Sequence, residues 1–437
     1  MPQCPKAGLA MKRILAIAVA LLIAVPLLVI GIEVMKSPEQ DHPGVPVADS
    51  AAQVARGAYL AQAGNCMACH TVHGGDEYAG GRAIRSRFGD IYAPNITPDE
   101  ETGIGTWSAD DFWRAMHNGK SRDGSFLYPA FPYPNYTKVS RADSDAIHAY
   151  LQTVLPVKQQ NREHDLSFPY NQRILLAFWR TLYFEPGIYQ PETNQSVDWN
   201  QGAYLVQGLG HCSACHTSRD AFGGSAGSDS FAGGMIPMQN WYAPSLHPDA
   251  GSGLAAWDAQ DIAALLRTGV SRQGAVYGPM AEVVSASLQH LTQKDVDAMA
   301  VYLKSLPAQE AQRPAKAMAA HGNTDAVLEL GAKIYEQHCV ECHAANGKGQ
   351  PPAYPPLAGN TSLTTGPAVN PIRMILSGGF PPSTDGNPRP YGMPPYSMTL
   401  SDEEIAAVLS YVRTAWGNQG SLVSSVEVGR LRGTPLE

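Results

Sequence analysis

Three copies of the motif Cys-x-x-Cys-His carry the clearest chemistry in this chain of 437 residues. They read CMACH, CSACH and CVECH and begin at Cys66, Cys212 and Cys339. The two thiols of such a motif can add to the two vinyl groups of a haem, and the adjacent His then lies below the iron. A bare Cys-x-x-Cys leaves a redox dithiol or half a zinc site open, but the His and the repetition favour covalent attachment. The sequence therefore predicts three haem c groups.

The motifs assign residues to attachment and to iron binding. The predicted attachment residues are Cys66, Cys69, Cys212, Cys215, Cys339 and Cys342. The predicted proximal iron ligands are His70, His216 and His343. Only Cys4 remains of the seven cysteines, so the chain has no disulfide framework, and we assign Cys4 no function.

The sixth iron ligand decides whether a haem transfers electrons or binds a small molecule. Methionine is the usual ligand in electron carriers, because its thioether favours Fe(II) and raises the potential. In the third copy, "YGMPPY" supplies Met393, with Met398 as the alternative. In the second copy, "YGPMAEVV" supplies Met280, and the weaker candidates are Met235 and Met238.

The first copy departs from this pattern. Aligning "SRQGAVYGPM" with "SRDGSFLYPAF" puts Phe131 in the slot of Met280, and phenylalanine cannot bind iron. Three possibilities stay open: a ligand from elsewhere in this domain, a five-coordinate iron, or a ligand from a neighbouring domain or partner. His117 is the first choice as sixth ligand of the first haem, followed by Met116 and His73.

The elements that position these residues repeat with a period of about 145 residues. "RGAYLAQAGNCMACHT" recurs as "QGAYLVQGLGHCSACHT", and "DSDAIHAYLQTVLP" recurs as "DVDAMAVYLKSLP". A looser third unit opens with "GAKIYEQHCVECH" and closes with "SDEEIAAVLSYVRTAW". Each unit predicts a helix before the motif, a long Gly- and Pro-rich loop, and a closing amphipathic helix. This is the pattern of class I cytochrome c domains, in which the two terminal helices cross beside the haem crevice.

The N-terminal segment predicts a membrane anchor. Lys6, Lys12 and Arg13 precede an uncharged apolar run over 14–32, which as a helix would extend roughly 28 Å. The run is not followed by a small-x-small cleavage site, which favours an uncleaved helix. The basic residues predict a cytoplasmic N-terminus and haem domains on the periplasmic side of the bacterial inner membrane. Met11 also resembles a natural start, in which case residues 1–10 are an extension.

The expected fold class is therefore mainly α, with three tandem class I cytochrome c domains after an N-terminal transmembrane helix. The predicted segments are the cytoplasmic N-terminus 1–13, anchor 14–32, tether 37–50, first domain 51–157, connector 158–195, second domain 196–307, linker 308–325, third domain 326–420 and C-terminal tail 421–437. Within the connector, "RILLAFWRTLYF" predicts an amphipathic helix that packs between domains or, alternatively, rests on a membrane surface.

Composition excludes several function classes. The net charge of −8 and the absence of a basic stretch argue against nucleic acid as a partner. No nucleotide-binding loop, flavin or molybdopterin signature, or nucleophile arrangement is recognisable, so we predict no catalytic residue.

Four segments resemble one family. "IYAPNITPDEETGIGTWS", "LYPAFPYPNYT", "YNQRILLAFWRTLYF" and "YGMPPY" are similar to the tri-haem cytochrome c subunits of bacterial membrane-bound alcohol, gluconate, fructose and aldehyde dehydrogenases. The resemblance covers most of residues 50–420. It implies an electron-transfer subunit that takes electrons from a catalytic dehydrogenase subunit and passes them to ubiquinone or a terminal oxidase.

Phe131 indicates which branch of this family the chain is most similar to. Family members commonly have Met at this position, as in "YPAMPY", and the Phe form is more similar to cytochromes that accompany molybdenum and iron–sulfur hydroxylases. The partner is then a molybdenum and iron–sulfur enzyme or a quinoprotein. Two alternatives are a peroxidase-like haem enzyme with an open iron in the first domain, and a cytochrome subunit of a terminal oxidase.

Overall fold

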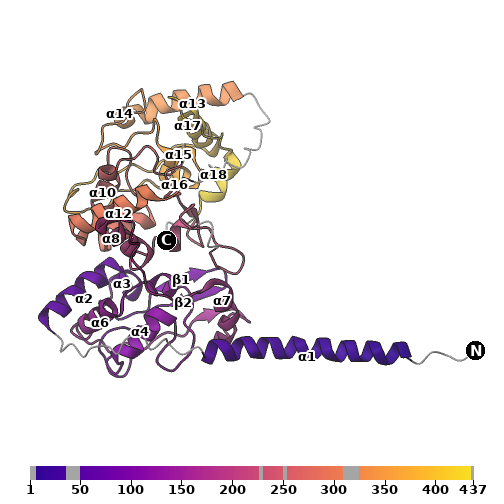
Figure 1. The fold of residues 1–437 in the computed structure, drawn as a ribbon. Coiled ribbons are helices and arrows are strands. Elements are labelled where there is room, and N and C mark those ends of the chain that lie inside the picture. Colours follow the sequence, from indigo (N-terminus) through magenta and orange to yellow (C-terminus); the bar gives the residue numbers. More distant parts are fainter. Residues whose placement is uncertain (1–5, 36–49, 226–229, 250–252, 309–323, 435–437) are drawn as a thin grey trace, which may run out of the picture.

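The computed structural model describes residues 6–35, 50–225, 230–249, 253–308 and 324–434. Cys4 and most of the predicted tether 37–50 and linker 308–325 lie outside the described residues. The three domains follow one another along the molecule, and the N-terminal helix α1 (Lys6–Met35) projects from the side of the first (Figure 1).

Two crossing helices frame each domain. The pairs are α2 (Ala51–Ala63) with α6 (Arg141–Leu151), α8 (Val197–Gln207) with α12 (Gln293–Ser305), and α13 (Thr324–His338) with α17 (Asp402–Thr414). Five of these helices are preceded by a Ser or Thr whose side-chain oxygen accepts a hydrogen bond from the backbone N–H three positions later. This bond satisfies one of the free N–H groups in the first turn of the helix. These capping residues are Ser50, Ser140, Ser196, Thr292 and Ser401.

A glycine allows the close approach at every crossing. A Cβ atom would lie 1.8 Å from the Ala146 carbonyl oxygen at Gly57, 1.9 Å from that of Ala298 at Gly202, and 2.2 Å from that of Ala407 at Gly331. No side chain fits at these distances, so the glycine of "RGAYL", "QGAYL" and "LGAKI" is required for the helices to cross. The crossing expected of the three repeated units is present.

Shorter elements lie between the crossing helices. In the first domain they are α3 (Cys66–His70), β1 (Ala83–Ser86), β2 (Gly89–Tyr92), α4 (Ala109–Asn118) and α5 (Tyr133–Tyr136). In the second they are α9 (Ser213–His216), β4 (Gly234–Ile236), β5 (Trp241–Ala243), α10 (Ala259–Thr268), α11 (Pro279–Ala286) and the 3₁₀ turn η3 (Leu288–His290). In the third they are α14 (Val340–His343), α15 (Thr361–Thr364) and α16 (Val369–Ser377), with α18 (Ser425–Leu431) in the tail.

The strands form two small antiparallel sheets. The connector strand β3 (Asp165–Leu166) completes the order β1-β2-β3, with Ala83 opposite Tyr92 and Gly89 opposite Leu166. The second sheet is the hairpin of β4 and β5.

Two hydrophobic cores hold the domains together. The first and second domains share one core, which includes Leu60, Ile147, Leu209, Val284 and Met299. The third domain has its own core around Ile334, Ile372, Ile405 and Val408. The first two domains therefore form one packed body, and the third contacts it through α16 and β5.

The connector forms the predicted helix. It consists of the 3₁₀ turn η1 (Arg173–Leu175) and α7 (Leu176–Tyr183), which packs beside α1. The indole N–H of Trp179 donates to the Phe222 carbonyl of the second domain at 3.2 Å. The helix therefore packs between neighbouring parts of the protein, as preferred from the sequence.

The predicted membrane anchor is wrong. Among the residues whose side chains are described, no helix combines the length and the apolar character needed to cross a membrane. The end of α1 is instead held by protein contacts: Glu33 is 2% exposed and paired with Arg180, and the Lys120 Nζ donates to the Glu33 carbonyl at 2.9 Å. The fold class is corrected accordingly, to three domains without the transmembrane helix over 14–32. The predicted inner-membrane location with periplasmic haem domains depended on that anchor and is overturned by the same finding.

Candidate haem-binding sites

The His of each motif makes the same hydrogen bond. The Nδ1 atoms of His70, His216 and His343 lie 2.7, 2.7 and 3.1 Å from the carbonyl oxygens of Pro94, Pro244 and Pro355. Because a carbonyl oxygen only accepts, Nδ1 carries the proton and Nε2 keeps its lone pair. Burial lowers the pKa of all three imidazoles, which favours the neutral form that binds a metal. Such a hydrogen bond fixes the tautomer and orientation of a metal-binding histidine.

The prolines come from unlike places in the sequence. Pro94 and Pro244 occupy the repeated phrases "YAPN" and "YAPS", 24 and 28 residues after their histidines. Pro355 follows His343 by only 12 residues, in the different phrase "YPP". Sequence reasoning missed these partners, although the repeated "YAP" is a signal that could have found the first two.

The motif cysteines are free thiols, five of them half-buried and Cys69 exposed. None of the six is in a disulfide. Burial raises the pKa of Cys66 and Cys212 to about 12 and that of Cys339 to about 11, so these sulfurs stay protonated at neutral pH. Within the described ranges no three His, Cys, Asp or Glu side chains converge as they would around a metal ion. Each motif thus offers two free thiols and one imidazole, a donor set that fits a porphyrin-held iron better than a zinc cage.

Two arginines hold the backbone of the first two motifs. Arg82 donates from Nη1 to the carbonyl of Ala68, and Arg219 donates from Nη2 to the carbonyl of Ala214 at 2.9 Å. Both alanines lie between the cysteines of their motif. Neither arginine was among the residues predicted from the sequence.

The two predicted distal methionines are partly buried, whereas the alternative methionines are exposed. Met280 is the second residue of α11 and Met393 lies before α17, and each is partly buried against the core of its domain. The backbone N–H and carbonyl of Met393 pair with those of Gly379 at 2.8 and 3.0 Å. By contrast, Met398 is 97% exposed, and Met235 and Met238 are exposed as well. An exposed thioether is poorly placed to reach a buried iron.

The first domain lacks a comparable methionine. Phe131 packs against the shared core, with its ring centroid 5.2 Å from that of Tyr136. The Tyr136 hydroxyl donates to the Gly64 carbonyl at 3.0 Å, just before the first motif. Phe131 is therefore close to the first motif, as the alignment with Met280 leads one to expect.

His117 has contacts typical of a packing residue. Its ring stacks on Trp113 with centroids 4.4 Å apart and an interplanar angle of 13°. Its Nδ1 lies 3.3 Å from the Thr137 hydroxyl. Met116 is buried in the shared core, and His73 is exposed. The sixth ligand of the first haem stays a prediction, and these contacts give His117 no support.

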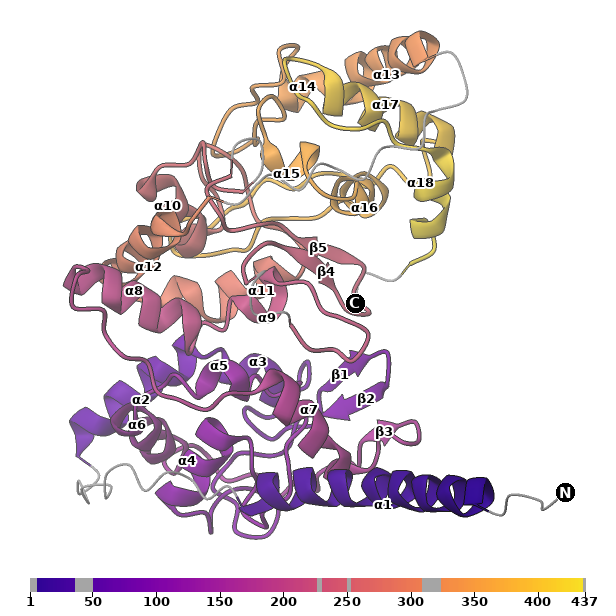
Figure 2. The same cartoon turned by 45° about the vertical axis from the view of Figure 1, so that its right-hand side comes forward.

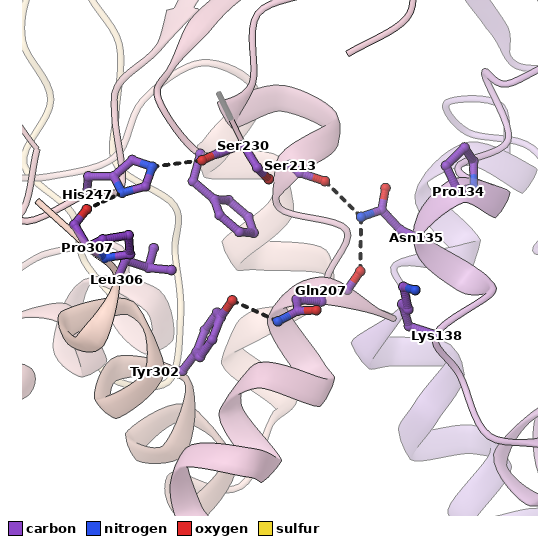
Figure 3. Close-up of a pocket in the computed structure, with 11 residues that line it drawn as sticks. Pro134, Asn135, Lys138, Gln207, Ser213, Ser230, His247, Tyr302, Leu306 and Pro307 are labelled. Atoms are coloured by element: carbon purple, nitrogen blue, oxygen red, sulfur yellow. Dashed lines mark hydrogen bonds between the residues drawn. The ribbon is translucent and has the colours of Figure 1, made fainter. Parts of the chain in front are cut away.

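The first two motifs lie close to each other across the domain boundary. Burial raises the pKa of Cys69, the nearby Arg82 guanidinium lowers it, and the Glu282 carboxylate and the Cys215 thiol of the second domain raise it. Beside this boundary lies a cavity of about 420 Å³, lined by Pro134, Asn135 and Lys138 of the first domain and by the second domain's Gln207, Ser213, Ser230, Phe231, His247, Tyr302, Leu306 and Pro307 (Figure 3).

One polar side chain of this cavity, that of Asn135, joins the two domains, whereas His247 bonds within the second domain. The Asn135 Nδ2 donates to the Gln207 carbonyl at 3.0 Å and to the Ser213 hydroxyl at 2.8 Å, and Ser213 lies inside the second motif (Figure 3). Both ring nitrogens of His247 lie against carbonyl oxygens, those of Pro307 and Ser230, at 2.8 and 2.7 Å. These polar groups already bond to other protein groups. We therefore interpret the cavity as a gap at the domain boundary rather than as a ligand site.

Comparisons with known proteins identify one cytochrome c domain around each motif. A model of the cytochrome c family matches residues 54–155, 201–307 and 328–416. The cytochrome c subunit of alcohol dehydrogenase (quinone) from Gluconacetobacter polyoxogenes is 40% identical over 404 residues, covering 89% of this chain and 86% of that protein. The gluconate 2-dehydrogenase cytochrome c subunit of Pantoea cypripedii is 38% identical, covering 87% and 90%. A nicotinate dehydrogenase subunit of Pseudomonas putida is 42% identical over 83% of this chain and 30% of that protein.

Proposed function

The chain belongs to the cytochrome c family, with one copy of the family's domain around each of its three motifs, and we propose that it is the electron-carrying subunit of a dehydrogenase complex. Three covalently bound haem c groups supply reversible one-electron chemistry. The residues of this chain attach these groups, orient the imidazole below each iron, and hold the domains in contact.

We propose the residue roles as follows. The six motif cysteines attach the haems, His70, His216 and His343 bind the iron from the proximal side, and Met280 and Met393 bind it from the distal side in the second and third domains. The observation that carries this proposal is the Nδ1 hydrogen bond to a proline carbonyl, found at all three histidines. It leaves Nε2 as the only ring nitrogen able to bind iron. We do not extend the ligand proposal to His117.

We infer that the electron donor is a separate catalytic dehydrogenase. The relatives include cytochrome subunits of alcohol, gluconate and fructose dehydrogenases, and a subunit of nicotinate dehydrogenase. The resemblance of the segment around Phe131 favours a molybdenum and iron–sulfur partner, with a quinoprotein as the alternative. As the acceptor we propose ubiquinone or a terminal oxidase.

Purification from the native host tests the partner. The full chain carries a C-terminal affinity tag, and the companion protein is identified by mass spectrometry. We then add a primary alcohol, gluconate or nicotinate and follow reduction of the haem α band. The expected result is a co-purifying dehydrogenase and reduction by one substrate class. A companion that carries copper and haem would instead support the oxidase-subunit alternative, and a haem chain isolated alone that turns over peroxide would overturn the proposal.

A second candidate function concerns the first haem only. Phe131 stands in the position that Met280 occupies in the second domain, and Phe131 cannot bind iron. An open iron would bind carbon monoxide or peroxide. Carbon monoxide binding by about a third of the reduced haem distinguishes this candidate from a chain of three closed electron carriers.

A further inference from the structure

The first two domains contact each other through a reciprocal pair of hydrogen bonds. The Tyr204 hydroxyl of α8 donates to the Asp143 carboxylate of α6 at 2.6 Å, and the Tyr59 hydroxyl of α2 donates to the Asp295 carboxylate of α12. The two tyrosines occupy the same position of the repeated phrases "RGAYL" and "QGAYL". The two aspartates also correspond, since each lies three residues after the Ser or Thr that caps its helix. Each domain therefore supplies its tyrosine to the aspartate of the other.

The backbone beside each aspartate takes part in the same exchange. The N–H of Ser140 donates to the Tyr204 hydroxyl at 3.0 Å, and the N–H of Thr292 donates to the Tyr59 hydroxyl at 3.2 Å. A contact in which both sides supply the same groups is the form that two identical chains adopt about a two-fold axis. The boundary between the first two domains has this form, although a single chain supplies both sides.

The third domain has charged residues at the two corresponding positions. Lys333 occupies the position of the exchanging tyrosines, two residues after the glycine of its helix crossing, and is exposed. Glu404 occupies the position of the exchanging aspartates, three residues after the capping Ser401. One oxygen of its carboxylate accepts from the Ser401 N–H at 2.8 Å, and a carboxylate can accept several further hydrogen bonds. A cation and an anion thus replace the hydroxyl and the carboxylate of the first two domains.

Exposed apolar side chains lie near these charges. Leu330 precedes Lys333 by three positions, so both lie on one face of α13, and Leu330 is 40% exposed. Met398 lies just before the N-terminus of α17 and is 97% exposed. Interfaces between proteins are enriched in Met at their centre and are polar at their rim. We call Leu330, Lys333, Met398 and Glu404 the third-domain face.

The third-domain face lies at an outer end of the molecule. Figure 2 shows α13 and α17 side by side, at the end opposite α1. The tail helix α18 packs on α17, where Arg432 donates to the Asp402 carboxylate. Because Asp402 and Glu404 are two positions apart in one helix, their side chains point to opposite sides of it. Helix α18 therefore covers the side of α17 away from Glu404.

We propose that the third domain binds the third domain of a second copy of this chain through the third-domain face. Lys333 of each copy forms an ion pair with Glu404 of the other, in the places that the tyrosine–aspartate bonds occupy between the first two domains. A second copy suits this face better than an unrelated protein, because the two exchanging positions hold opposite charges and therefore match each other under a two-fold rotation. Leu330 and Met398 are covered in the same contact.

The contact has a consequence for electron transfer that rests on the proposed function. Between the first two domains the exchange is accompanied by a close approach of the motifs, since Asn135 of the first domain donates to Ser213 inside the second motif at 2.8 Å. Two third domains in the same arrangement bring their motifs together in the same way. Electrons then pass between the third haems of two copies, and one dehydrogenase subunit can reduce the haems of both chains.

The test measures self-association of the full chain by sedimentation velocity. Haem content is measured first, by the pyridine haemochrome assay, and a nonionic detergent prevents association through the exposed apolar side chains of α1. We expect a reversible dimer at micromolar concentration whose dissociation constant rises in 1 M salt, because salt screens ion pairs. A chain that stays monomeric at every concentration refutes the proposal.

Charge reversal tests the exchange itself. Lys333→Glu puts two pairs of like charges into the dimer, as does Glu404→Lys, and each should raise the dissociation constant about a hundredfold or more. An equal mixture of the two variants should recover dimers, because one chain of each kind restores two opposite-charge pairs. The matched control Lys348→Glu changes the net charge equally at an exposed position in the loop after the third motif, and should leave the constant unchanged.

Other outcomes identify which proposal fails. A mixture that associates no better than either variant alone refutes the two-fold exchange. If the native chain is monomeric and Lys333→Glu instead releases a co-purifying dehydrogenase, the face binds that subunit, and this inference fails while the proposed function stands. Fewer than three haems in the native chain would overturn the proposed function itself. If Glu404→Lys does not fold, Glu404→Gln decides: it keeps the capping acceptor, loses the charge and should raise the dissociation constant about tenfold, and an unchanged constant refutes the proposal.

Discussion

Arg82 of the first domain donates from both terminal nitrogens to the carboxylate of Glu282 in the second, and the Nη2 to Oε2 distance is 3.0 Å. The same guanidinium donates to the Ala68 carbonyl inside the first motif. Glu282 lies two positions after Met280 in α11. One side chain therefore connects the first haem-binding motif to the helix that carries the proposed distal ligand of the second haem.

We expect this ion pair to position the domains rather than to stabilise them strongly. The two side chains are 41% and 46% exposed, and exposed pairs contribute about 1 kcal/mol or less. A double-mutant cycle with Arg82→Gln and Glu282→Gln, measured by urea unfolding, should give a coupling below about 1 kcal/mol that decreases in 1 M salt. Glu101→Gln, which removes the exposed partner of Lys158, is the control. A salt-insensitive coupling of several kcal/mol would contradict this expectation.

Replacing each proposed distal methionine should remove the sixth ligand from the iron of one haem. Met280→Ala and Met393→Ala are each expected to convert about a third of the haem from low to high spin, because a thioether ligand is lost. Optical and electron paramagnetic resonance spectra measure the change. Met398→Ala removes a methionine that is 97% exposed and should leave the spectra unaltered. Unaltered spectra for Met280→Ala or Met393→Ala would refute the corresponding assignment.

His117→Ala should leave the haem spectra unchanged and lower stability. The ring stacks on Trp113, and the Thr137 hydroxyl approaches its Nδ1, so we expect a loss of about 1 to 3 kcal/mol in the free energy of unfolding. His73→Ala, at an exposed position, is the control for stability. A conversion of one haem to high spin in His117→Ala would show instead that His117 is the sixth ligand.

The stability of the first domain should depend on pH through His164. Burial and the nearby Arg173 cation lower the pKa of His164 to about 4, from an ordinary value of about 6.5. The folded state keeps this ring neutral while the unfolded chain takes up a proton below pH 6.5. The stabilisation is therefore complete above pH 6.5 and is lost as the pH falls towards 4. Melting temperatures measured across this range should fall less steeply for His164→Gln than for the native chain or His73→Gln, and identical slopes would count against the assignment.

The attachment of α1 depends on a buried ion pair. Arg180 Nε lies 3.1 Å from the Glu33 carboxylate, both side chains are 3% exposed, and Arg180 also donates to the Asn118 carbonyl at 2.6 Å. Removing one partner leaves a buried charge uncompensated, so Glu33→Ala or Arg180→Ala should each cost about 3 to 5 kcal/mol. Urea unfolding measures the loss. The double variant Glu33→Leu, Arg180→Met should recover most of the loss. Equal losses in the single and double variants would contradict the argument.

The sequence by itself determined the cofactor, the domain count and the crossing helices. Covalent attachment needs two thiols and an imidazole within five consecutive residues, so local order alone predicts the haems. The repeated Gly of "RGAYL" and "QGAYL" is likewise visible in the chain, and a Cβ atom there would lie 1.8 or 1.9 Å from a carbonyl oxygen of the crossing helix, so no other residue fits. These features depend on neighbours in sequence, which is why pattern and spacing revealed them.

The tertiary structure decided what depends on residues far apart in the chain. His343 finds its carbonyl at Pro355 rather than in a "YAP" phrase, the ring of His117 lies against Trp113, and Glu33 meets Arg180 although 147 positions separate them. An apolar run of the composition seen over 14–32 predicts a spanning helix, yet the contacts of its last turn can be known only once the first domain is folded. Packing brings these distant side chains together because their shapes fit and because a buried charge needs a partner. The spacing of residues within one motif reveals neither.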